Sequence, residues 1–431
     1  MRLARILIVF TICLGLSGCN VLAQVDYPDD VITFWHANTG VGLEATNAVV
    51  DAFNESQDEY TVKPMYSASS TGHDEKLLAA VAGGNPPDIM RFDRFMIGAW
   101  AAEGALTDLT ELAERDGVLE RPYYPFAIEE ATYQDKLYGL PISVDSRLVF
   151  YNKDHFKAAG LDLNDLPKTL DELEEAADVL TKKTGNRFDQ IGFIPWYDQG
   201  SLYTWGWSFG GQFVDPETGK VTANDEEIVA ALQWLVDYGD KYGVEEMTGF
   251  VDSQGSNAMD PFLSGQLSMT VSGPWKVPQI RKFAPDLNYG VFPIPTPDGS
   301  DPITWSGGFS MVVPKGAQNV DGAWEFAKYF SSQEGQEIFS GIIGDFAVMD
   351  SANEALGYTD DPILGEFIDI LPDAKYRPVL PEGALLWNEL VSAIDHATRH
   401  NGTPQEILDD VTNYVNQKME RKNLLQGEGE S

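Results

Sequence analysis

Three residues in the segment LYTWGWSFGG have the spacing of a hydrolase nucleophile motif. Gly206, Ser208 and Gly210 spell G-x-S-x-G, in which a serine is presented on a tight turn between a strand and a helix. Such a serine also needs an acid and a histidine later in the chain. The only later histidines, His396 and His400, lie in a segment expected to be a solvated helix face. The sequence therefore does not favour an esterase.

Aromatic residues crowd the same segment and indicate a different chemistry. Sugars have apolar C–H faces that stack on rings, and hydroxyls that need planar hydrogen-bonding side chains. A sugar cleft therefore combines tryptophan and tyrosine with aspartate, arginine and asparagine. The candidate stacking rings in this region are Trp196, Tyr203, Trp205 and Trp207. Some must be core residues, since alternate residues of an extended segment point in opposite directions.

Polar residues follow two expected strands and could hold sugar hydroxyls. His36 and Asn38 come just after the first strand, and Asp93 and Arg94 come just after the third. Ligands of open α/β sheets lie beyond the carboxyl ends of the strands, which favours binding roles. His36 could equally be a packed histidine, and Asp93 with Arg94 could be a surface ion pair.

These residues depend on an expected alternation of strands and helices. Strands are predicted at 31–35, 60–62 and 88–90, with helices between them over about 43–53 and 73–82. This spacing is that of βαβ units, which predicts an α/β protein with largely parallel sheets.

The middle of the chain contains further local signals. Residues 145–151 form another predicted strand. Thr169 and Glu172 form a capping box before an amphipathic helix that Gly185 can end.

The N-terminus has the pattern of a bacterial lipoprotein signal. Two arginines precede an apolar run and the small residues Leu16-Ser17-Gly18-Cys19. Residues 1–18 are expected to be removed, and Cys19 to carry the lipid. Residues 20–30 would then be a tether. The alternative is an ordinary secretory signal with a chance cysteine.

The charge of the chain excludes several partners. The sequence has 67 acidic and 29 basic residues, a net charge of −38 spread along 431 residues. Such a surface repels nucleic acid and anionic lipid headgroups. Membrane attachment is therefore expected only through the lipid. The length is enough for two or three domains.

Several motifs together resemble a known family. LYGLPISVDSRLVFYNKDHFKAAGL (137–161) is similar to the segment that first crosses between the lobes of maltose-binding-type proteins of ABC sugar importers. ITFWHANTG, GNPPDIMRFDRF, MTVSGPW, YGVFPIPTPDG and TWSGGFSMVVPKGAQNVDGAWEFAKYFSSQEGQEIF stand in the same order as in that family. The resemblance covers nearly all of the chain after the signal.

The resemblance implies the two-lobe periplasmic-binding-protein fold of type II. Each lobe would be a mostly parallel sheet flanked by helices, with the ligand cleft between the lobes. Lobe 1 would comprise 31–142 and 309–356, and lobe 2 would comprise 145–305 and 360–422. Residues 423–431 would be a flexible tail.

The resemblance also implies roles for particular residues. Asp93 and Arg94 would grip hydroxyls from lobe 1, and Asp145, after the first crossing, would accept from two adjacent hydroxyls. The alternative for Asp145 is a hinge residue that accepts from nearby backbone amides. Trp275 and Trp387 would offer rings, although core packing is the alternative for each. The remaining implied site residues are Gly308, where the backbone could approach the ligand, and Arg377.

The function implied is that of an extracytoplasmic binding subunit without enzymatic activity. It would capture a sugar, expected to be a small oligosaccharide, and deliver it as a monomer to the transmembrane subunits of an ABC permease. No cofactor and no metal ion are expected. One alternative is a binding protein for glycerol 3-phosphate or a similar polyol phosphate, and another is a secreted carbohydrate-active hydrolase.

Overall fold

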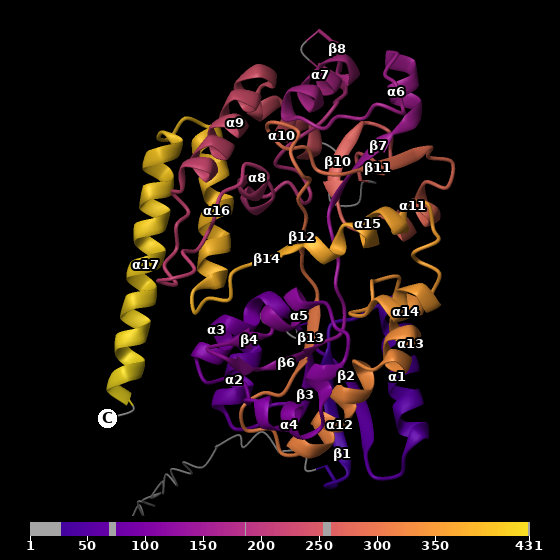
Figure 1. The fold of residues 1–431 in the computed structure, drawn as a ribbon, viewed down its shortest axis with the longest axis vertical. Coiled ribbons are helices and arrows are strands. Elements are labelled where there is room, and N and C mark those ends of the chain that lie inside the picture. Colours follow the sequence, from indigo (N-terminus) through magenta and orange to yellow (C-terminus); the bar gives the residue numbers. More distant parts are fainter. Residues whose placement is uncertain (1–26, 69–74, 186, 253–259, 430–431) are drawn as a thin grey trace, which may run out of the picture.

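The computed structural model describes residues 27–68, 75–185, 187–252 and 260–429. The predicted signal, Cys19 and most of the predicted tether lie outside the described residues. The chain forms two lobes stacked along the long axis, with the short strands β12 (Trp305–Ser306) and β14 (Lys375–Tyr376) between them (Figure 1). Among the described helices, none is both long and apolar enough to cross a membrane.

Lobe 1 contains a mixed five-stranded sheet. Its order is β2 (Thr61–Tyr66), β1 (Val31–His36), β3 (Ile89–Asp93), β13 (Phe309–Val312) and β6 (Gly139–Pro141). The predicted strands β1, β2 and β3 run parallel, whereas β13 is antiparallel to β3 and β6. Because β13 enters lobe 1 directly from a crossover, it starts where the parallel strands end.

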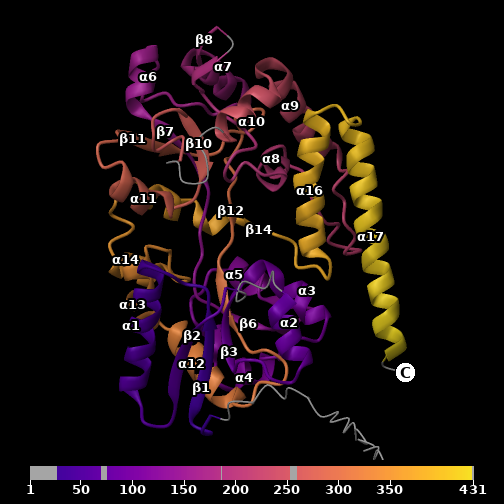
Figure 2. The same ribbon diagram turned by 180° about the vertical axis from the view of Figure 1, so that it is seen from behind.

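Helices cover the buried face of this sheet. Ile32, Phe34 and His36 alternate on that face of β1, as the period of a strand requires. Phe326 packs edge-on against Phe34, with ring centres 5.2 Å apart. Figure 2 shows α1 and α13 side by side, and the two helices are in contact. The lobe 1 helices are α1 (Val41–Ser56), α2 (Glu75–Ala82), α3 (Ile97–Ala102), α4 (Thr110–Arg115), α5 (Pro125–Glu129), α12 (Val320–Phe330), α13 (Gln333–Ile343) and α14 (Asp350–Ala355).

Lobe 2 differs from the mostly parallel sheet expected. Its three-stranded sheet has the order β10 (Met269–Ser272), β7 (Leu148–Asn152) and β11 (Tyr289–Phe292), and β7 is antiparallel to both neighbours. As with β13 in lobe 1, the reason is that β7 enters its lobe directly from a crossover. The strand β7 leaves the crossover and runs away from lobe 1, so its antiparallel neighbours β10 and β11 run back toward lobe 1.

Most helices of lobe 2 lie around this sheet, whereas α16 and α17 pack against α9 at one side of the molecule, and α17 extends alongside lobe 1 (Figure 1). The predicted capping box of Thr169 and Glu172 is present at the start of α7. The segment 202–208 is the helix α8, not the extended run expected from the sequence. The lobe 2 helices are α6 (Lys153–Ala159), α7 (Leu170–Leu180), α8 (Leu202–Ser208), α9 (Glu226–Tyr242), α10 (Val244–Asp252), α11 (Lys276–Phe283), α15 (Leu364–Asp369), α16 (Gly383–Thr398) and α17 (Pro404–Gly429).

The chain passes between the lobes three times. The first passage joins β6 to β7, the second joins β12 to β13, and the third lies between α14 and α15 (Figure 1). The first and second passages are held together, because the N–H groups of Ile142 and Ser143 both donate to the carbonyl of Phe309. The base of the space between the lobes is therefore made of crossover backbone.

Candidate functional site

A cleft of about 410 Å³ lies between the two lobes at the crossovers. The residues that line it come from β3, from the first and second passages between the lobes, from the end of α13, and from the segments after β10 and β14. Its lining residues are Arg91, Asp93, Ser143, Val144, Asp145, Arg147, Gln199, Trp275, Gly307, Gly308, Phe309, Ile343, Asp345 and Arg377.

Three arginines of the cleft are each paired with an aspartate. The Arg91 guanidinium lies 3.9 Å from Asp345, and that of Arg377 lies 3.4 Å from Asp93. Arg147 forms an ion pair with Asp145. The charges of the lining therefore balance, although the chain as a whole is strongly acidic.

The same arginines lie over aromatic rings. The guanidinium of Arg91 lies 3.2 Å from the ring centre of Phe309 on the neighbouring strand β13. Arg147 lies 3.5 Å from the ring centre of Trp305 and 5.3 Å from that of Trp275. Guanidinium groups stack on aromatic faces because they are planar and weakly hydrated.

Burial and neighbouring charges change the pKa values of the cleft. Burial raises the pKa of Asp345, the positive charge of Arg91 opposes this shift, and the negative charge of Asp145 adds to it. Burial lowers the pKa of Arg91 to about 10. Burial also opposes the charge of Arg377, but Glu130 and Asp93 raise its pKa above the ordinary value. The charges of Arg91 and Arg377 are thus opposed by burial and supported by nearby carboxylates.

The cleft brings together five of the predicted site residues. Asp93, Asp145, Trp275, Gly308 and Arg377 all line it. Asp145 accepts a 2.5 Å hydrogen bond from the N–H of the glycine at position 307, which fixes the carboxylate against the second crossover. Gly308 has φ 134°, and a Cβ there would lie 2.1 Å from the carbonyl oxygen of the residue at 143. Only glycine fits this close approach of the two crossovers.

Arg94 lies beneath the cleft rather than in its lining. Its side chain is 0% exposed. It donates to Glu130 at 2.7 Å, to the carbonyl of Ser143 at 2.9 Å and to the carbonyl of Gly307 at 2.6 Å. Arg94 therefore joins lobe 1 to both crossovers, and its donors are used for structure, contrary to the expectation that it grips a hydroxyl.

Two other candidates from lobe 1 are packed beside the cleft. His36 is 1% exposed, and its Nδ1 accepts a 3.2 Å hydrogen bond from the N–H of Asn38. The Asn38 amide donates to Thr46 at 2.7 Å. Burial, with a smaller contribution from Arg91, lowers the pKa of His36. Of the two alternatives that the sequence left for His36, a hydroxyl contact or a packed histidine, the structure shows the packed histidine.

Most predicted stacking rings belong to two groups of rings in lobe 2 that meet at the helix α8, and we call the two groups together the α8 cluster. Trp205 is 0% exposed and donates to the carbonyl of Pro195 at 2.7 Å. Trp196 packs edge-on against a tyrosine of α9, with ring centres 6.3 Å apart. The members of the α8 cluster are Phe193, Trp196, Tyr203, Trp205, Trp207, Phe213, Trp234 and Tyr238.

The cluster and the nucleophile motif are structural in this arrangement. Ser208 is the last residue of α8, and its hydroxyl donates to the carbonyl of Pro295 at 2.7 Å. Trp387 is half-buried and stacks on Tyr203, with ring centres 5.8 Å apart. These two rings lie next to the cleft but do not line it.

Sequence reasoning missed several lining residues. Arg91 and Arg147 each stand two residues from a predicted acid, and side chains two apart on an extended strand share a face. That spacing was available in the sequence as a signal. Gln199 and Asp345 lie in loops with no comparable pattern. In the part of the chain that the structure describes, no group of three His, Cys, Asp or Glu side chains could hold a metal ion.

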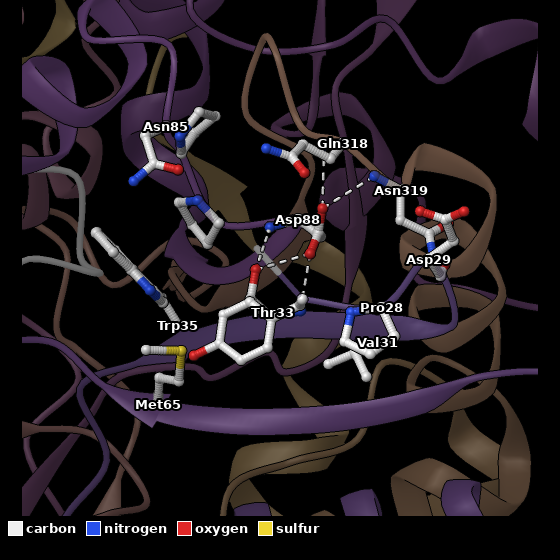
Figure 3. Close-up of a pocket in the computed structure, with 13 residues that line it drawn as sticks. Pro28, Asp29, Val31, Thr33, Trp35, Met65, Asn85, Asp88, Gln318 and Asn319 are labelled. Atoms are coloured by element: carbon white, nitrogen blue, oxygen red, sulfur yellow. Dashed lines mark hydrogen bonds between the residues drawn. The ribbon is translucent and has the colours of Figure 1, made fainter. Parts of the chain in front are cut away.

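A second hollow, of about 420 Å³, lies along the face of β1 that carries Val31, Thr33 and Trp35 (Figure 3). Asp88 in its wall accepts from the N–H and the hydroxyl of Thr33 and from the N–H groups of Gln318 and Asn319. These four bonds tie β1 and β3 to the segment before α12. The carboxylate is thus used for structure, which favours the cleft between the lobes as the ligand site.

Comparisons with known proteins agree with this geometry. The family of "Bacterial extracellular solute-binding protein" matches residues 37–337. The sn-glycerol-3-phosphate-binding periplasmic protein UgpB of Brucella melitensis biotype 1 is 29% identical over 331 residues, which is 74% of this chain and 73% of that protein. The maltodextrin-binding protein MdxE of Bacillus subtilis (strain 168) is 24% identical over 343 residues, which is 79% of each chain.

A solved structure extends the similarity to three dimensions. CpMnBP1 with mannotriose bound is 28% identical, with a TM-score of 0.79. The match covers 89% of this chain and 99% of that chain. The two-lobe fold expected from the sequence is therefore confirmed.

Proposed function

The chain belongs to the family of bacterial extracellular solute-binding proteins, and we propose that its ligand is a sugar held in the cleft between the lobes. The ligand is a short oligosaccharide or a smaller sugar, delivered intact to a membrane permease of the ABC type. The similarity to CpMnBP1 with mannotriose bound and to a maltodextrin-binding protein supports this ligand class.

The observation that carries the proposal is the composition of the cleft. Trp275 offers a ring, and Asp93 and Asp145 offer carboxylates, in one space between two lobes. A ring and planar charged groups match the two kinds of surface that a sugar presents. The volume of about 410 Å³ lies toward the lower end of the roughly 300–1,000 Å³ of small-molecule sites.

A polyol phosphate is the second candidate, supported by the similarity to UgpB. The three arginines of the cleft are the residues that would hold a phosphate. Each of them is paired with an aspartate, so a phosphate would have to displace a carboxylate or lie beside it. This charge balance favours a neutral sugar over an anion.

In this proposal the protein captures and delivers the sugar without changing it chemically. Closing the lobes over the ligand shifts the open and closed populations by the difference in the ligand's affinity for the two states. The closed form then docks on the permease. Cys19 carries the lipid that holds the protein at the outer side of a bacterial membrane, because two acyl chains anchor a protein firmly.

The test is a thermal shift and tryptophan fluorescence titration of the purified protein. The panel contains monosaccharides, mannose and glucose oligosaccharides, and glycerol 3-phosphate. A ligand that binds only the native state raises the melting temperature in a concentration-dependent way. The bound sugar is then recovered and examined by chromatography.

We expect a shift with a sugar that is recovered unchanged. A shift with glycerol 3-phosphate alone would replace the sugar by the second candidate. A sugar recovered in cleaved form would overturn the transport proposal in favour of a hydrolase.

A further inference from the structure

Arg377 separates the cleft from a group of four aromatic rings. Its guanidinium carbon lies 4.3 Å from the ring centre of Phe95, 5.5 Å from Trp305 and 6.0 Å from Trp387. Tyr203 completes the group, because it stacks on Trp387 with the ring planes 25° apart. None of the four rings is among the described residues that line the cleft, and Trp305 is also covered by Arg147, which lies 3.5 Å from its ring centre. We call them the covered rings.

Arg377 is held firmly in this position. Its side chain is 9% exposed, and it lies 3.4 Å from Asp93 and 3.3 Å from Glu130. Glu130, which is 1% exposed, also accepts from Arg94, the arginine that joins the two crossovers. The guanidinium is therefore a fixed end wall of the cleft and not a mobile surface group.

A buried polar group also lies behind this wall. The hydroxyl of Tyr203 is buried and makes no hydrogen bond within the described part of the chain. Buried tyrosine hydroxyls usually find a partner, because an unsatisfied donor is costly. The charges of Arg377 and Glu130 both act on this hydroxyl. The covered rings thus combine apolar faces with an unused donor, which is the combination that suits a sugar unit.

We propose that Arg377 determines how long a sugar the cleft accepts. Its guanidinium lies over the rings of Phe95 and Trp387, on which one further sugar unit would stack, so the natural ligand ends at Arg377. This inference rests on the proposed sugar function and adds a length limit to it. A smaller side chain at this position opens the rings of Phe95 and Trp387, with the hydroxyl of Tyr203 nearby, as an additional subsite.

The experiment compares wild-type protein with Arg377→Ala by isothermal titration calorimetry. The ligands are two series, from mannose to mannotetraose and from glucose to maltotetraose. We expect the ratio of affinities for longer over shorter sugars to rise by about tenfold in the variant, since one ring stack contributes about that factor. A structural role of Arg377 alone would lower the affinity for every length equally.

Arg281→Ala is the matched control. Arg281 is an exposed arginine of α11 that pairs with Asp361 away from the cleft lining, so its loss removes the same side chain without opening the covered rings. The length ratio of this control should equal that of the wild type. If Arg377→Ala does not fold, Arg377→Gln provides the same ratio, because it keeps a polar group for Asp93 and is shorter.

The outcomes separate this inference from the proposed function. A wild-type protein that binds sugar, with an unchanged length ratio in both variants at Arg377, overturns the length limit and leaves the function intact. A wild-type protein that binds neither series and no other sugar of the panel described above overturns the sugar function itself. A higher ratio in the variants supports both.

Discussion

The rings of the cleft and the rings of the α8 cluster differ in what surrounds them. In the cleft, Trp275 and Phe309 face guanidinium groups and an open space. In the α8 cluster, Trp205 faces other rings and has no exposed surface. A tryptophan with charged neighbours and an open face can exchange its contacts for a ligand, whereas a tryptophan enclosed by rings stabilises the lobe.

The same difference applies to the arginines. Those at 91, 147 and 377 line the cleft beside aspartates, whereas Arg94 is enclosed and bonded to two crossover carbonyls. The residue type alone does not distinguish a ligand contact from a structural contact. Exposure toward the cleft and the number of donors already used make the distinction.

The largest expected effect comes from the buried carboxylate beneath the cleft. Glu130→Ala leaves Arg94 and Arg377 without their shared partner, and removal of one partner from a buried ion pair costs about 3–5 kcal/mol. The free energy of unfolding in denaturant should fall by about that amount. The control is Glu420→Ala, which breaks an exposed ion pair with Lys220 and should cost under about 1 kcal/mol. Equal losses in the two variants would contradict this assignment.

The second effect tests the α8 cluster. Trp205→Ala removes a fully buried ring, which should lower the free energy of unfolding by about 3–5 kcal/mol. Sugar affinity, measured by titration of the folded fraction, should stay close to the wild-type value. A large loss of affinity with unchanged stability would place Trp205 in the binding site after all.

The third effect concerns a ring of the cleft, whose loss should lower sugar affinity more than stability. Trp275→Ala removes a half-buried ring that faces Arg147 and the open space. The affinity for sugar should fall by roughly tenfold or less, the factor expected from one stacked ring. The melting temperature without ligand should change less than in Trp205→Ala. Affinity that is insensitive to this substitution would exclude Trp275 from the ligand contacts.

The smallest effect concerns His36, which packs beside the cleft. Its pKa in the folded protein lies below the ordinary value of 6.5 because of burial and Arg91. As pH falls below 6.5, the unfolded state therefore takes up a proton before the folded state does, and stability is lost. Denaturant unfolding of wild type and His36→Gln over mildly acidic pH should show a shallower loss in the variant. Identical slopes would mean that His36 titrates alike in both states.

Local patterns in the sequence predicted much of the fold. The alternation of strands and helices gave β1 to β3, and Thr169 with Glu172 gave the start of α7. These features depend on neighbours along the chain, so a single segment contains the information. The reversed directions of β7 and β13 were not predicted, because they follow from where a crossover enters each lobe.

The sequence by itself determined the two-lobe family and the types of residue available for a cleft. Tertiary structure decided which residues reach the cleft, because that depends on contacts between segments far apart in the chain. Arg94 and Arg377 are both arginines with aromatic neighbours in the sequence, and nothing else in their sequence context distinguishes their roles. Arg94 is a buried link between the first and second passages, because it donates to Glu130, Ser143 and Gly307, which come from three distant segments. Arg377 instead forms the end wall of the cleft. Packing fixes which donors are already used, and only the unused ones can bind a ligand.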